Sequence, residues 1–182
     1  MFLVGHSGGG LVFLMHLARN PQRCRHVQGI VTLASQATEA GATLGSRLKI
    51  VGFAAMNRLL GYLPGPALGL GPENEFRGVM SQWFHWNLSH QWLSRDGFDY
   101  AQALSLIDVT TVMFAGVGDR FIAPVRGCQR LHDLLGSRDK QLVVCGKSTG
   151  FAEDYDHTRI IASRPGRREI WPMILNWMRA RA

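Results

Sequence analysis

The 182-residue sequence lacks the features that mark several large classes of protein. It has no run of about 18 apolar residues, so we expect no transmembrane helix. The apolar start, residues 1–17, has no basic leading segment and is broken by glycines, which argues against a secretory signal peptide. No internal repeat or low-complexity tract is present. With 46% hydrophobic residues, the chain can bury a core of ordinary size.

Cysteine is scarce, and the chain has three of them, Cys24, Cys128 and Cys145. Their odd number and their spacing argue against a disulfide framework and against a zinc site. We therefore interpret them as reduced thiols, with Cys145 buried in a strand, and we expect no metal and no cofactor. Reduced thiols favour a cytoplasmic location.

Acidic residues are outnumbered, since 13 Asp and Glu against 20 Lys and Arg give a formal net charge of +7. Such a charge raises the question of a nucleic-acid partner, or of another anionic polymer. No nucleic-acid-binding motif and no alternation of aromatic and basic residues accompanies the arginines near the C-terminus. We interpret these arginines as a solvated basic face and expect no nucleic-acid partner. They are Arg164, Arg167, Arg168, Arg179 and Arg181.

The most informative motif lies at the N-terminus, where the apolar residues 1–4 are followed by Gly5-His6-Ser7-Gly8-Gly9. This is the G-x-S-x-G pattern of a nucleophile elbow, a strained turn between a strand and a helix. We expect Gly5 and Gly9 to be required because side chains there would collide with the backbone. The start of the following helix would stabilise an oxyanion at the serine. A structural glycine turn is the alternative, whereas the spacing fits neither a phosphate loop nor a dinucleotide fingerprint.

The rest of the chain alternates between helical and strand patterns. Such alternation predicts an α/β fold in which helices cover both faces of a parallel sheet. The expected elements after the elbow are a helix ending at Asn20-Pro21, strands over 27–34, 110–115 and 141–145, and helices from Pro124 to about 135 and over 168–179.

Residues 36–98 interrupt this alternation with Gly- and Pro-rich stretches and a group of aromatic residues. We interpret them as an inserted helical cap, with residues 1–35 and 99–182 as the core domain. The aromatic residues line an apolar acyl pocket or form the cap's own core, and Trp83 and Trp86 are candidate substrate-binding residues. The apolar stretch 48–70 with its basic neighbours is also compatible with contact with a membrane surface.

A serine nucleophile needs a histidine that takes its proton and a carboxylate that fixes the tautomer of that histidine. Asp119 follows the third predicted strand and His157 follows the fourth, so both are expected at the same edge of the sheet as Ser7. Asp119 is also suited to cap the next helix. Other candidates stay open: Asp99, Asp108, Asp154 and Asp156 for the acid, and His6, His16, His26, His85, His90 and His132 for the base.

These residues resemble the α/β-hydrolase superfamily of serine esterases and lipases, in its C-terminal portion from the elbow strand onward. The elbow, the turn over residues 114–124 and Asp156-His157 carry the resemblance, which covers nearly the whole chain outside the cap. It implies strands 5 to 8 of that fold, with the cap between strands 6 and 7. It also implies Ser7 as nucleophile, His157 as base, Asp119 as acid and the Gly8 N–H as an oxyanion donor. His6, beside the nucleophile, is a further candidate substrate-binding residue.

The first four strands of that family, and the loop that supplies a second oxyanion donor, have no counterpart here. We therefore expect a truncated chain with an exposed first strand and low turnover, since one missing donor costs about 10²–10³-fold. The predicted function is hydrolysis of a small-molecule carboxylic ester or thioester with an apolar acyl group. The alternative is a non-catalytic remnant or binding module, and the sequence does not specify an oligomeric state.

Overall fold

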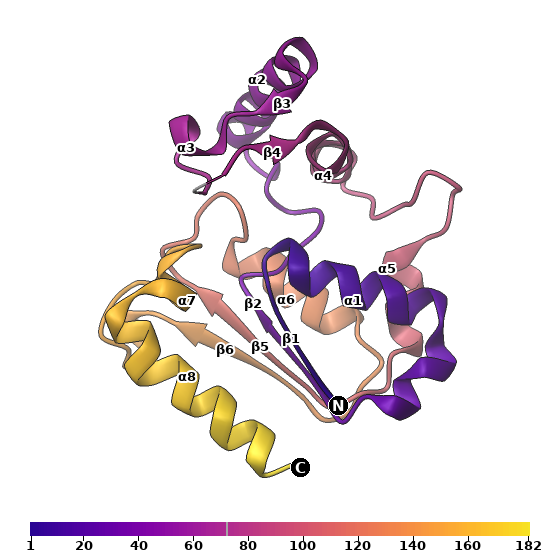
Figure 1. Ribbon diagram of the computed structural model, residues 1–182, viewed down its shortest axis with the longest axis vertical. Helices are drawn as coiled ribbons and strands as arrows, with labels where there is room; N and C mark the ends of the chain where they lie inside the picture. The colour runs from indigo at the N-terminus through magenta and orange to yellow at the C-terminus, as the bar shows by residue number, and fades with distance from the viewer. Residues whose placement is uncertain (72) are drawn as a thin grey trace. The chain divides into compact units, whose positions relative to one another are not determined.

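The computed structural model describes residues 1–71 and 73–182, so Pro72 of the Gly- and Pro-rich stretch lies outside it. The described residues form two compact units (Figure 1). The first unit comprises residues 1–36 and 93–182, and the second comprises residues 37–92. The second unit lies within the segment expected to be a cap, and its role as a cap stays a prediction.

A four-stranded parallel sheet in the order β1-β2-β5-β6 forms the first unit. Its strands are β1 (Phe2–His6), β2 (Gly29–Leu33), β5 (Thr111–Gly116) and β6 (Lys140–Cys145). Every residue of β2 and β5 is buried, as is typical of central parallel strands that are covered on both faces. At one edge of the sheet, Val4 of β1 is 51% exposed.

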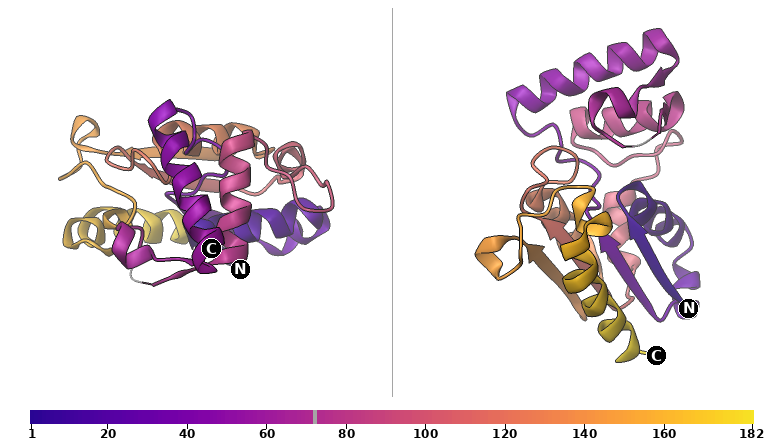
Figure 2. Two further views of the ribbon diagram at one scale, coloured as in Figure 1. Left: turned by 90° about the horizontal axis from the view of Figure 1, so that it is seen from above. Right: turned by 60° about the vertical axis from the view of Figure 1, so that its left-hand side comes forward.

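Helices cover both faces of this sheet (Figures 1 and 2). The longest are α1 (Gly8–Arg19), α6 (Val125–Leu134) and α8 (Arg164–Arg179). The short ones are η1 (Pro21–His26), α5 (Tyr100–Ala103), η2 (Leu104–Leu106), η3 (Lys147–Thr149) and α7 (Arg159–Ala162). Helices α1 and α6 lie on one face, and α8 packs Ile170 and Ile174 against the core that contains Val31 and Phe114. The predicted α/β fold is confirmed.

Local signals explain where most of these helices begin and end. Helix α1 stops before Asn20, and Pro124 immediately precedes α6, as expected. Helix α8 begins at Arg164 and not at 168 as predicted. The Ser163 side chain accepts a hydrogen bond from the Gly166 N–H, and this N-cap extends the helix by a turn.

The second unit is mainly helical. It contains α2 (Leu44–Leu60), β3 (Tyr62–Leu63), α3 (Gly65–Leu68), β4 (Glu75–Phe76) and α4 (Arg77–Ser89). Strands β3 and β4 form a small antiparallel pair that the sequence analysis did not anticipate. In the core of this unit, Trp86 packs edge to face against Trp92.

Helix α2 carries an apolar stripe on its exposed side. The stripe consists of Leu44, Leu48, Val51 and Leu59, whose spacing places them on one helix face. No helix in the part of the chain that the structure describes is long and apolar enough to cross a bilayer. Contact of this region with a membrane surface stays a prediction.

Candidate active site

Ser7 lies in a strained turn between β1 and α1. Its φ of 53° and ψ of −126° are uncommon for a residue with a side chain. The turn is held from both sides, since the Ser7 N–H donates to the Leu33 carbonyl and the Ser35 hydroxyl donates to the Ser7 carbonyl, each at 2.8 Å. This conformation is the one expected of a nucleophile elbow.

Of the two glycines expected to be required in the turn, Gly5 is constrained by its surroundings and Gly9 is not. A Cβ on Gly5 would lie 2.6 Å from the Gly10 nitrogen, and a Cβ on Gly10 would collide with the Ser35 hydroxyl. A Cβ on Gly9 would meet no atom within 4 Å. The expectation that Gly9 must lack a side chain is therefore wrong, because Gly9 lies on the exposed side of α1.

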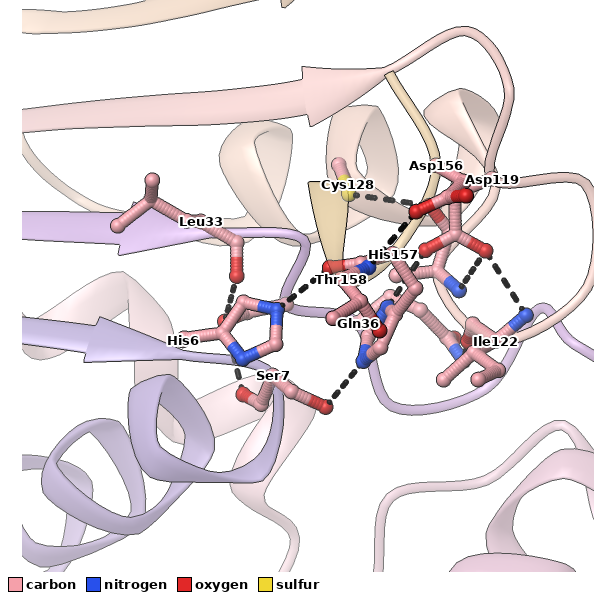
Figure 3. A network of polar contacts seen from close by, with 12 residues as sticks. His6, Ser7, Leu33, Gln36, Asp119, Ile122, Cys128, Asp156, His157 and Thr158 are labelled. Carbon is pink, nitrogen blue, oxygen red and sulfur yellow. Dashed lines mark hydrogen bonds and ion pairs between the residues drawn. The ribbon is translucent and has the colours of Figure 1, made fainter. Parts of the chain in front are cut away.

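Three side chains far apart in the sequence meet at the carboxyl edge of the sheet (Figure 3). His157 Nε2 lies 2.8 Å from Ser7 Oγ, and His157 Nδ1 lies 2.6 Å from Asp119 Oδ2. Because an ionised carboxylate only accepts hydrogen bonds, Asp119 selects the tautomer with hydrogen on Nδ1. The Nε2 atom is then free to accept the hydroxyl proton of Ser7, which is the arrangement a general base requires.

Asp119 is fixed by the main chain around it. Its side chain is nearly buried, and Oδ1 accepts hydrogen bonds from the N–H groups of Ile122 and Ala123, each at 3.0 Å. One carboxylate oxygen therefore closes the turn before α6, and the other faces His157. The turn also lies against the histidine-bearing loop, since the Gly118 N–H donates to the Tyr155 carbonyl at 2.9 Å.

The competing aspartates have other partners. Asp99 accepts a hydrogen bond from the Gln102 N–H at the start of α5, and Asp154 accepts one from the Lys147 N–H. Asp156, beside His157, caps α7 through the N–H groups that follow it. Asp119 is the acid candidate that the structure places against His157.

Two further candidates lie beside Ser7. Gly8 begins α1, so its N–H belongs to the first helical turn, whose N–H groups have no acceptor within the helix. His6 Nε2 lies 2.7 Å from the carbonyl oxygen of His157. His6 thus contacts the main chain of His157, and substrate binding by His6 stays a prediction.

The two tryptophan candidates belong to the second unit. Trp86 is 5% exposed and is part of that unit's core, while Trp83 packs edge to face against Phe84. This agrees with the alternative in which the aromatic residues stabilise their own unit. Contact of Trp83 or Trp86 with substrate stays a prediction.

Two of the three cysteines, Cys128 and Cys145, are buried. Burial raises the pKa of the Cys128 thiol to about 12, and the charge of Asp119 contributes to this shift. Burial likewise raises the pKa of Cys145 to about 12, so neither is an activated thiolate. Within residues 1–71 and 73–182, no group of three or more His, Cys, Asp or Glu side chains is placed to hold a metal ion.

Two sets of groups that shape the site were not predicted from the sequence: the Ser35 hydroxyl, which bonds to Ser7, and the N–H groups of Ile122 and Ala123, which bond to Asp119. The spacing of Asp119 and Ile122 is typical of a hydrogen bond from a backbone N–H to a nearby aspartate side chain, and this spacing could have predicted the bond to Asp119. Ser35 gave no such signal, because its partner Ser7 lies 28 positions away.

No protein-family model and no curated protein sequence matches this chain. Solved structures do match it. A monoacylglycerol lipase from Paleococcus ferrophilus has a TM-score of 0.64 and 17% identity, over 100% of this chain and 68% of that one. A putative non-heme bromoperoxidase from Mycobacterium tuberculosis has a TM-score of 0.62 and 13% identity, over 100% and 67%. A thermophilic esterase from Thermogutta terrifontis has a TM-score of 0.55 and 18% identity, over 99% and 65%.

The shared architecture is an α/β fold with a four-stranded parallel sheet and its helices. The chain spans about two thirds of the length of the structures it matches. At these identities the likeness concerns the fold. The chain therefore has the α/β-hydrolase fold, over the portion that begins with the elbow strand.

Proposed function

We propose that the protein is a serine hydrolase that cleaves a carboxylic ester or thioester. The observation that carries this proposal is the continuous set of hydrogen bonds from Ser7 through His157 to Asp119, with the serine in a strained turn at a helix N-terminus. A lipase and an esterase among the structures of the same fold support the same reaction class.

In the proposed first step, Ser7 Oγ attacks the carbonyl carbon while His157 Nε2 takes the hydroxyl proton. Asp119 stabilises the imidazolium that forms. The Gly8 N–H donates to the oxyanion of the tetrahedral intermediate, helped by the positive end of α1. Collapse of the intermediate breaks the bond to the alcohol or thiol, which leaves with the proton from His157. In the second step a water molecule attacks the acyl carbon while His157 takes its proton. The bond to Ser7 Oγ then breaks, the carboxylic acid leaves, and His157 returns the proton to Ser7.

We propose a small-molecule substrate with an apolar acyl group. Comparing p-nitrophenyl esters of increasing acyl length tests this point. An activity that is independent of chain length would contradict an apolar acyl pocket.

A fluorophosphonate probe tests the proposed nucleophile, because it reacts with an activated serine and does not require turnover. We expect the folded chain to be labelled at one site and Ser7→Ala to be unlabelled. Ser105→Ala is a matched control, since Ser105 is exposed and its hydroxyl bonds locally to the Gln102 carbonyl. Absence of labelling in the folded parent chain would favour the alternative of a non-catalytic protein.

A further inference from the structure

We propose that His6 is a positioning residue for His157: its ring fixes the main chain of the proposed base relative to the strand that carries the proposed nucleophile. The contact stands on the geometry alone, whereas its effect on reactivity rests on the function proposed above.

The hydrogen bond between the two residues has one direction. His6 Nε2 lies 2.7 Å from the carbonyl oxygen of His157. A carbonyl oxygen only accepts, so Nε2 of His6 must carry the hydrogen and donate it. The two rings also lie near one another, with centroids 4.8 Å apart and planes tilted by 47° (Figure 3). The residue directly before Ser7 thus holds the residue that bonds to the Ser7 hydroxyl.

His157 needs such an anchor because residues 150–158 contain neither helix nor strand. The bonds of the His157 ring to Asp119 and Ser7 hold its side chain. Around it, the Tyr155 carbonyl accepts from the Gly118 N–H, and Asp156 caps α7. The bond from His6 acts on the main chain of His157 itself. His6 ends β1, where it pairs with Leu33 of the buried strand β2, so one rigid element positions both the serine and the histidine.

The charge state of His6 suits this role. Burial is the largest effect and lowers the pKa of His6. The bond to the His157 carbonyl raises this pKa, a positive charge on His157 lowers it, and the charge of Asp119 raises it, with a lowered pKa as the net result. A neutral His6 donates its hydrogen bond without placing a second cation beside the imidazolium that forms on His157. An arginine or lysine in the same place would oppose that imidazolium.

Two variants of His6 distinguish the effect of its hydrogen-bond donor from the effect of its ring. His6→Gln keeps an N–H near the position of Nε2, whereas His6→Phe keeps a ring and leaves the His157 carbonyl without its donor. His16→Phe is the control, because His16 lies exposed on α1. The first readout is the rate of fluorophosphonate labelling of Ser7 as a function of pH. A misplacement of a reacting group by about 1 Å can lower a rate about 10²-fold. We therefore expect the plateau of the labelling rate at high pH to be about 10²-fold lower in His6→Phe than in the parent, and to be largely restored in His6→Gln.

The second readout is imidazole NMR, which does not depend on reactivity. In the parent chain we expect His6 in the Nε2–H tautomer and a low-field proton on His157 Nδ1, shared with Asp119. That proton signal should weaken in His6→Phe and persist in His6→Gln and His16→Phe. A charged or Nδ1–H His6 in the parent, or an unchanged His157 signal in His6→Phe, would overturn the positioning role. Absence of labelling in the parent would instead overturn the proposed function. The NMR result would then show by itself whether His6 positions His157.

Discussion

Asp119→Asn is the sharpest test of how the site works, because the substitution changes one atom in a buried setting. The amide oxygen can still accept the two hydrogen bonds that Oδ1 receives from the N–H groups of Ile122 and Ala123. The amide nitrogen then replaces Oδ2, 2.6 Å from His157 Nδ1. An amide N–H donates and cannot accept, so His157 must place its hydrogen on Nε2. In that tautomer Nε2 has no lone pair for the Ser7 proton.

The expected loss is large because nearly all molecules hold the wrong tautomer. An isosteric Asp to Asn change at the acid of a serine triad lowers turnover by about 10⁴-fold, which corresponds to about 5 kcal/mol at 1.36 kcal/mol per factor of ten. We expect a similar fall in the rate of fluorophosphonate labelling, with circular dichroism unchanged. Asp156→Asn is the matched control, since Asp156 is the neighbour of His157 and caps α7, a role that asparagine fills equally well. Labelling of Asp119→Asn at the parent rate, or its loss in Asp156→Asn, would refute this reasoning.

Three further predictions concern stability and surface contact. Gly116→Ala should lower the free energy of unfolding in urea by about 3 kcal/mol, because its Cβ would collide with the Tyr155 carbonyl, whereas Gly9→Ala should not destabilise the protein. Because folding lowers the pKa of His6, its imidazole takes up a proton at a higher pH in the unfolded chain than in the folded one. The free energy of unfolding of the parent should therefore fall more than that of His6→Gln between about pH 7 and pH 5, and equal losses would contradict this. Sedimentation with anionic vesicles should weaken in Leu48→Glu, on the exposed stripe of α2, and not in Leu106→Glu, an exposed leucine of the first unit.

The three-dimensional contacts around the site could not be read from patterns along the chain. Six other histidines competed with His157 for the role of base, and the contact of His157 with Ser7 joins residues 150 positions apart. Gly5 is constrained as predicted, but the second constrained glycine, Gly10, lies one position beyond the motif, because its neighbour Ser35 is supplied by the segment after β2. His6 illustrates the same limit: the motif placed it beside Ser7, and only the folded loop placed its ring against His157.

The sequence by itself determined the order of the strands and main helices of the first unit, the strained turn at Ser7 and the edge of the sheet to which Asp119 and His157 belong. These features depend on local patterns of apolar residues, glycine and proline, and on the rule that parallel strands end at one edge. The tertiary structure decided which side chains touch there, because hydrogen bonds of 2.6–2.8 Å depend on how the loops after β5 and β6 pack on the buried sheet. That packing is a property of contacts between distant segments, and no single segment encodes it.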